Sequence, residues 1–230
     1  MNDIIPFHKW HDVYDPDEDE RSPFYGKTYD EYKVIYNYAI HPYWDEFGSE
    51  TLYVKILSAD YEAGAAILEL IGEWNDTIEN DIMLLKRNVM EPLLDAGISK
   101  YVLICENVLN FHASDDCYYE EWSEQCQDSF NGGWTALINT FEHVEAEMHD
   151  AHIDRYFRVG DLYNNFDWRL YTPNAIIKWV ESRENLKTQR LKGFWRVFFG
   201  YVARRTELSV EEIEKKVKNL FDKTENSEVK

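Results

Sequence analysis

Alternating and continuous apolar segments predict five strands after residue 50. Residues 51–58 (TLYVKILS) alternate as in a half-buried strand. Residues 65–71 (AAILELI) follow as an antiparallel partner, after turn residues that end in Gly64. The continuous apolar run 101–105 (YVLIC) is typical of a central strand buried on both faces. Residues 134–138 (WTALI) predict a further inner strand, and residues 156–159 an edge strand.

Helical spacing of apolar residues predicts helices between these strands. One helix should open at Asn75 and Asp76, where Asp76 and Glu79 would form a capping box. Its apolar face would comprise Ile78, Ile82, Leu85, Val89 and Leu93. Further helices are expected over residues 116–127, over 142–151 and from Thr172-Pro173 onwards. The alternation predicts an α/β fold with a mixed, largely parallel sheet, an antiparallel opening hairpin, covering helices and extra C-terminal helices.

Changes in composition divide the chain into three parts. Residues 1–50 are aromatic and acidic and predict an irregular N-terminal arm, with at most a short helix near residues 29–38. Residues 51–182 form the predicted α/β domain, and residues 183–230 a basic, aromatic helical extension. Within this extension, residues 186–205 predict an amphipathic helix. Its prominent apolar and basic residues include Arg190, Phe194, Trp195, Arg196 and Phe198.

Charge changes this picture, because it is unevenly distributed. The 230 residues contain 24 Lys and Arg against 44 Asp and Glu, a net charge of −20. Residues 183–230 hold 12 basic and 8 acidic residues, so residues 1–182 carry a net charge of −24. This surface disfavours nucleic acid as a partner. The basic helix would dock on its own acidic domain, in a partner's groove or on an anionic membrane surface.

Cysteine usage and targeting signals predict a cytoplasmic protein. Cys105, Cys117 and Cys126 form no CxxC pair, which fits a reducing compartment. The first residues lack a secretory signal pattern, and no apolar run is long enough to span a membrane. His143, Glu147, His149 and His152 do not share a metal-ligand spacing, and no phosphate-binding or dinucleotide-binding motif is present. We therefore expect no metal and no cofactor.

Three stretches resemble the STAS family, the anti-sigma-factor-antagonist-like domains, over about residues 51–160. They are residues 101–111 (YVLICENVLNF), residues 132–139 (GGWTALIN) and residues 142–157 (EHVEAEMHDAHIDRYF). The resemblance implies a partner-switching module in which a serine at the start of the helix after the central strand is phosphorylated. Ser114 is the serine in that place, but the glycine of the family motif is missing and Asp115 and Asp116 follow. Ser114 is therefore interpreted either as the switch or as a plain helix cap.

The carboxyl ends of the predicted strands provide the candidate ligand or partner site. Ligands of open α/β sheets bind at such ends. The candidate rim residues are Trp74, Asn75, Glu106, Asn107, Asp115 and Asp116. With no catalytic set in the sequence, the favoured function is a non-enzymatic protein–protein interaction or regulatory module, whose protein partner could be basic. The alternatives are a peripheral membrane protein anchored by the 186–205 helix and an enzyme that uses strand-end carboxylates.

Overall fold

The computed structural model describes residues 3–28, 33–35, 38–113, 115–129, 132–184, 186 and 215. The chain divides into two compact units, Met1–Val180 and Glu181–Lys230. In the second unit, the described residues 181–184, 186 and 215 are helical. Apart from Leu186, the predicted amphipathic helix 186–205 lies outside the described residues. None of the described helices is long and apolar enough to cross a membrane.

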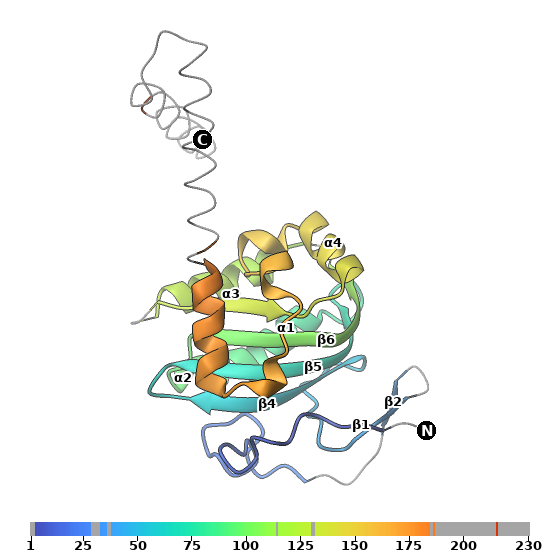
Figure 1. Cartoon of the computed structure of the whole chain (residues 1–230). Coiled ribbons are helices and arrows are strands. Elements are labelled where there is room, and N and C mark those ends of the chain that lie inside the picture. The colour runs from blue at the N-terminus through green and yellow to red at the C-terminus, as the bar shows by residue number, and fades with distance from the viewer. Residues whose placement is uncertain are drawn as a thin grey trace. The chain divides into compact units, whose positions relative to one another are not determined.

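A four-stranded mixed sheet forms the centre of the first unit (Figure 1). Its strands are β4 (Leu52–Asp60), β5 (Ala65–Asn75), β6 (Lys100–His112) and β7 (Trp134–Ile138), in the order β4-β5-β6-β7. β4 and β5 pair antiparallel, whereas β5, β6 and β7 run parallel to one another. The predicted fold class, a largely parallel sheet with an antiparallel opening hairpin, is confirmed.

Helices connect the parallel strands. The first begins as α1 (Asp81–Leu85), continues through a π-helical segment (Lys86–Met90) and ends as α2 (Glu91–Asp95). α3 (Cys117–Gln127) precedes β7, and α4 (Glu142–Asp150) follows it. Short 3-10 turns occupy Ile153–Arg155, Asp161–Tyr163 and Trp168–Leu170. Residues 173–180 are helical as predicted, and the amides of Ala175 and Ile176 bond to the Thr172 carbonyl.

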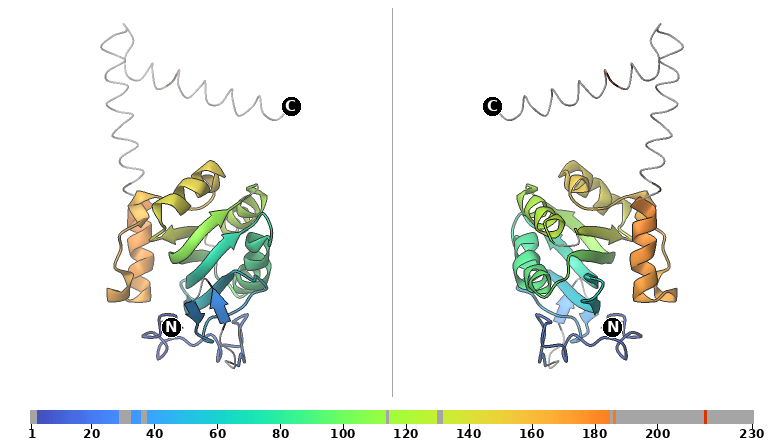
Figure 2. Two further views of the ribbon diagram at one scale, coloured as in Figure 1. Left: turned by 90° about the vertical axis from the view of Figure 1, so that its right-hand side faces the viewer. Right: turned by 90° about the vertical axis from the view of Figure 1, so that its left-hand side faces the viewer.

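The sheet is buried on both faces. On one face, strand residues such as Val54, Leu68 and Leu103 pack in a core with the apolar sides of α1, α2, α3 and α4. On the opposite face, Ile67 and Val102 pack in a second core with aromatic residues of the arm and with residues 173–180. Figure 2 shows α1, α2 and the helix of residues 173–180 on opposite sides of the sheet. Burial of both faces explains the uninterrupted apolar run of β6.

The N-terminal arm contains a small sheet of its own. β1 (Asp3–Ile4) pairs with β3 (Tyr38–Ile40), which also pairs with β2 (Lys33–Ile35). The prediction of a short helix near residues 29–38 is wrong for residues 33–35 and 38, which are the described residues of that range and belong to strands. Between these strands the chain crosses the sheet, where Phe7 and Trp10 meet Trp168 with ring centroids 4.8 and 5.8 Å away. The aromatic residues of the arm thus complete the second core.

Several predicted element ends are wrong. β5 continues to Asn75 and β6 to His112, because the two strands pair in parallel as far as Asn75 opposite His112. The next helix consequently begins at Asp81, and Ile78 is 77% exposed instead of lying on its apolar face. Asp76 does not form the predicted capping box, since its Oδ1 accepts a bond from the Ile82 amide at 2.8 Å. The expected edge strand at 156–159 consists of one bridge between Arg158 and Ala136.

Candidate functional site

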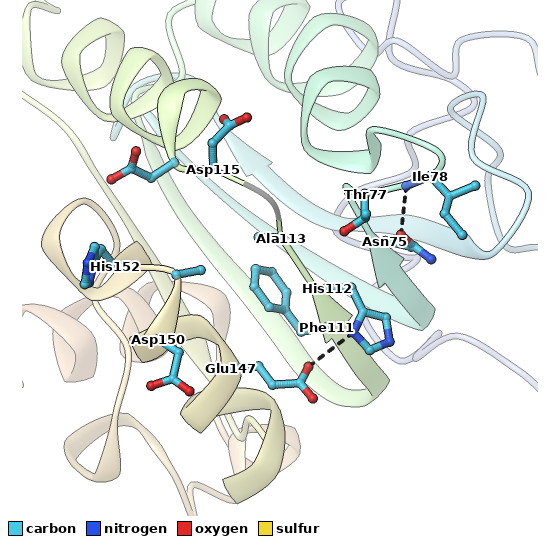
Figure 3. A pocket seen from close by; sticks show the side chains of 12 residues that line it. Asn75, Thr77, Ile78, Phe111, His112, Ala113, Asp115, Glu147, Asp150 and His152 are labelled. Atoms are coloured by element: carbon cyan, nitrogen blue, oxygen red, sulfur yellow. Dashed lines mark hydrogen bonds and ion pairs between the residues drawn. The ribbon is translucent and has the colours of Figure 1, made fainter.

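The carboxyl ends of β5 and β6 meet at one edge of the sheet. The amide of Asp76 donates to the carbonyl of His112 at 2.8 Å, which ties the two strand ends together. Beyond these ends, the segment after β5 turns away toward α1, and the segment after β6 turns away toward α3. The amino end of α3 and the carboxyl end of α4 flank this edge (Figure 3). Parallel pairing therefore creates a depression at the place where ligands commonly bind in α/β folds.

We call this depression the strand-end cleft, and its volume is about 690 Å³. Twelve residues line it: Asn75, Thr77, Ile78, Phe111, His112, Ala113, Asp115, Asp116, Glu147, Asp150, Ala151 and His152. They come from the end of β5, the end of β6, the start of α3, and the end of α4 with the turn that follows. Figure 3 shows the acidic side chains of α4 and of the loop before α3 around the cleft.

Negative charge dominates the strand-end cleft. Four of its lining residues are carboxylates (Asp115, Asp116, Glu147 and Asp150), and none of the described lining residues is Lys or Arg. The counter-charge available within the cleft is that of two histidines. His112 Nδ1 lies 3.7 Å from Glu147 Oε2, and both side chains are about half exposed. The cleft is therefore chemically suited to ammonium and guanidinium groups.

Local hydrogen bonds hold the acidic loop before α3 in place. Asp115 Oδ1 accepts a bond from the Cys117 amide at 3.2 Å, and Asp116 Oδ2 accepts one from the Tyr156 hydroxyl at 3.1 Å. Asp116 is also the residue that precedes the first turn of α3. These bonds fix the positions of the Asp115 and Asp116 side chains at the start of α3.

Asp76 lies behind the cleft and links its parts. Its carboxylate accepts bonds from Trp74 Nε1 at 3.0 Å, from the Ile82 amide and from the Tyr119 hydroxyl. Burial raises the pKa of Asp76 to about 6. One side chain thus joins the end of β5, the start of α1 and the inner face of α3, which gives Asp76 a structural role in keeping the cleft open.

Half of the rim residues predicted from the sequence lie at the cleft. Asn75, Asp115 and Asp116 line it, whereas Trp74 is fully buried in the core behind it. Glu106 and Asn107 lie elsewhere, because β6 does not end at Cys105 and both residues fall within the strand. Glu106 instead accepts bonds from Trp168 Nε1 at 3.3 Å and from the Arg169 guanidinium. Its prediction as a strand-end residue is wrong.

Several other predicted residues lie outside the described part of the chain. Ser114 is one of them, although its sequence neighbours Ala113 and Asp115 both line the strand-end cleft. The basic and aromatic residues proposed for a membrane or partner helix are also outside: Arg190, Phe194, Trp195, Arg196 and Phe198. The switch at Ser114 and the membrane or partner helix therefore stay predictions.

Comparison with known proteins finds a similarity among solved structures. No model of a known protein family matches the chain, and no match is found among curated proteins. Among solved structures, the chain is similar to a candidate anti-sigma factor antagonist from Thermotoga maritima. The two are 22% identical, the match covers 45% of this chain and 83% of that chain, and the TM-score is 0.34.

The sequence did not assign four of the residues that line the cleft to a ligand or partner site: His112, Glu147, Asp150 and His152. His112 follows from the true end of β6, which the polar residues after Cys105 concealed. Glu147 and His152 were examined as metal ligands of a helix face. Within the described residues, no group of three or more His, Cys, Asp or Glu side chains is arranged to hold a metal ion. What the four residues have in common is that they face one edge of the sheet.

Proposed function

We propose that this chain is a non-enzymatic regulatory module that binds a basic segment of a protein partner in the strand-end cleft. The observation that carries the proposal is the composition of the cleft. Its four carboxylates come from two separate elements and line one cleft, without a lysine or arginine among the described lining residues. An ammonium or guanidinium group entering the cleft would form charge-assisted hydrogen bonds with these carboxylates.

The cleft also offers apolar contact beside the charges. Ile78 stands exposed at its rim, and Phe111 forms part of its lining. A volume of about 690 Å³ admits two or three side chains, which suits a short peptide segment. A partner segment that alternates basic and apolar residues would therefore match both features. The net charge of −24 over residues 1–182 would steer such a partner toward this unit.

Phosphorylation of Ser114 fits this proposal as its regulatory step. A phosphate on Ser114 would add close to two negative charges beside Asp115 in the sequence, and Asp115 is one of the four carboxylates of the cleft. Added negative charge strengthens the attraction of the cleft for a cation, so phosphorylation should tighten the binding of a basic segment.

Selection of binding peptides would test the proposed function. A random dodecamer display library is panned against the full chain, and the selected peptides are measured by isothermal titration calorimetry. We expect peptides enriched in Lys and Arg, with an affinity that falls at least about tenfold between 50 and 500 mM NaCl. The double variant Glu147→Lys/Asp150→Lys should lose about 2 to 3 kcal/mol of binding free energy, since it places two cations in the cleft.

The matched control reverses the same number of charges away from the cleft. Glu18 and Glu62 are exposed and do not line the strand-end cleft, so Glu18→Lys/Glu62→Lys gives the same net charge. Equal losses in both double variants would show that general charge, not the cleft, binds the peptides, and the proposal would fail. Salt-independent binding or selection of acidic peptides would contradict it as well.

A further inference from the structure

A second cavity lies under the N-terminal arm, remote in sequence from the strand-end cleft. It forms where residues 6–17 pass over strand β4, and its volume is about 230 Å³. We call it the arm cavity. Its lining comprises Pro6, Phe7, His8, His11, Tyr14, Asp15, Pro16, Asp17 and Tyr43 from the arm and Lys55, Ile56 and Leu57 from β4. On a share of roughly 30 Å³ per water, this space would hold about eight water molecules.

Contacts at both ends of residues 6–17 fix the walls of the arm cavity. At one end, the Phe7 amide donates to Glu69 Oε2 of β5 at 2.9 Å. At the other end, Asp17 Oδ1 lies 3.7 Å from the ammonium of Lys55. Between them, Trp10 is buried against Phe7 and Trp168. The arm is therefore held as an arch over the strand, and the cavity beneath it is preformed.

The charges around the cavity decide which ligand it suits. Lys55 is nearly buried, and its ammonium lies 3.4 Å from Asp45 Oδ2 as well as near Asp17. Lys27 also pairs with Asp45, so two ammonium groups and two carboxylates balance one another. Asp15 adds a further carboxylate, whose Oδ2 lies 2.9 Å from His11 Nε2. These two ammonium groups stand against three carboxylates in all, so the arm cavity has one negative charge in excess among its lysine and aspartate groups.

The remaining lining is apolar and aromatic. Phe7, Tyr14 and Tyr43 contribute rings, and Leu57 and two prolines contribute aliphatic surface. Such a lining with a few polar groups is the usual composition of a small-molecule site. The rings and the single negative charge together favour a cation with a flat apolar body.

We propose that the arm cavity binds a small aromatic amine. Its ammonium would lie at Asp15 and Asp17, and its ring against the apolar wall made by Phe7 and Leu57. An aromatic acid is disfavoured, because Lys55 already has its carboxylate partners and Asp15 would repel the incoming charge. This site is independent of the proposed partner-binding function, which concerns the strand-end cleft.

Three probes with the same ring and different charges would test the proposal. They are tyramine (a cation), tyrosine (a zwitterion) and 3-(4-hydroxyphenyl)propionate (an anion), each titrated into the full chain and followed by isotope-edited NMR of the backbone amides. We expect tyramine to bind with a Kd below about 1 mM and to shift amides of residues 7–17 and 55–57. Tyrosine should bind about tenfold more weakly, and the anion should produce no saturable shift.

Two isosteric variants on the arm locate the binding group. Asp15→Asn removes the charge and keeps Oδ1, which accepts a hydrogen bond from the Asp17 amide at 3.0 Å. The arch formed by residues 6–17 should therefore persist. Asp15→Asn should raise the Kd of tyramine about tenfold. Asp12→Asn makes the same change at an exposed residue that does not line the cavity and should leave the Kd unchanged. No saturable binding of tyramine, equal binding of the anion, or equal effects of both variants would overturn the proposal.

Discussion

At the scale of single residues, Glu69 is the most unusual group of the sheet. It interrupts an apolar strand, it is 2% exposed, and its carboxylate holds the arm through the Phe7 amide. Arg169 stands 3.8 Å away and pairs more closely with Glu106. Burial raises the pKa of Glu69 to about 7, and burial also raises the pKa of Asp17 to about 6.

The shift of Glu69 predicts a pH-dependent stability. A carboxyl whose pKa is raised on folding binds more protons in the folded state, so it stabilises the protein at low pH. That stabilisation is complete below about pH 4.5 and is lost as the pH rises to about 7. Glu69→Gln removes the titration. As the pH rises from 5 to 8, the difference in unfolding free energy between Glu69→Gln and wild type should therefore change by up to about 3 kcal/mol in favour of the variant.

Urea unfolding at pH 5, 6, 7 and 8 would measure this difference. Glu62→Gln, which removes one exposed carboxylate at the turn between β4 and β5, is the control and should show no trend with pH. Parallel pH profiles for wild type and Glu69→Gln would mean that Glu69 is not the titrating group.

Residue by residue, the candidate site could be predicted only in part. The sequence indicated Asn75, Asp115 and Asp116, because each follows a recognisable strand or precedes a recognisable helix. Glu106 and Asn107 were misplaced, since a glutamate after an apolar run looks like the end of a strand. Arg169 explains how a glutamate can lie within the strand. It is 63 residues further along the chain, and its guanidinium neutralises the Glu106 carboxylate. Sequence pattern carries no signal for such a distant partner.

At the scale of elements, β6 shows why a regular pattern failed. Its pairing with β5 shifts register between Glu69 and Ile71 and again between Gly72 and Glu73. Each irregularity breaks the period of two, so the buried residues Val108 and Phe111 fall three positions apart. The second half of β6 therefore does not alternate, and it resembles a loop. β7, which pairs without such shifts, was predicted with its exact bounds.

The irregularity at Gly72 leads to a prediction for strand β5. Gly72 has φ = +122°, and a Cβ there would lie 1.9 Å from the Thr51 carbonyl oxygen of the neighbouring strand. Gly72→Ala should therefore cost about 3 kcal/mol or more of unfolding free energy. Gly26 also has a positive φ but has open space around it, so Gly26→Ala should cost only about 1 kcal/mol. Urea denaturation compares them, and equal losses would rule out the backbone contact as the cause.

At the scale of the whole molecule, net charge sets the response to salt. A charge of −20 repels itself in the folded state, and added salt screens this repulsion. Between 10 and 150 mM NaCl the Debye length falls from about 30 to about 8 Å, so we expect Tm at pH 7.5 to rise by about 2 to 4 °C. Near the sequence pI of about 4.7 the rise should disappear. A salt-induced decrease at pH 7.5 would show that attractive surface pairs outweigh the repulsion.

The largely parallel sheet with its antiparallel opening hairpin was predictable, and the place of the arm was not. Strand and helix alternation is a local property, and short connections leave few topologies to choose from. The arm is placed by non-local contacts, such as the Phe7 amide with Glu69 and Trp10 with Trp168. Composition indicated that the aromatic residues of the arm needed a surface to pack on, but no pattern in residues 1–50 specified which face of the sheet would supply it.

The contact between Trp10 and Trp168 has a consequence for synthesis of the chain. The ribosome makes the arm first, yet the ring that covers it emerges about 160 residues later, which takes roughly 8 to 30 s at 5 to 20 residues per second. Throughout that interval Phe7 and Trp10 lack one of their neighbours. During that interval the nascent chain thus presents an uncovered aromatic segment, and its apolar surface stays open to non-native contacts until the second core closes.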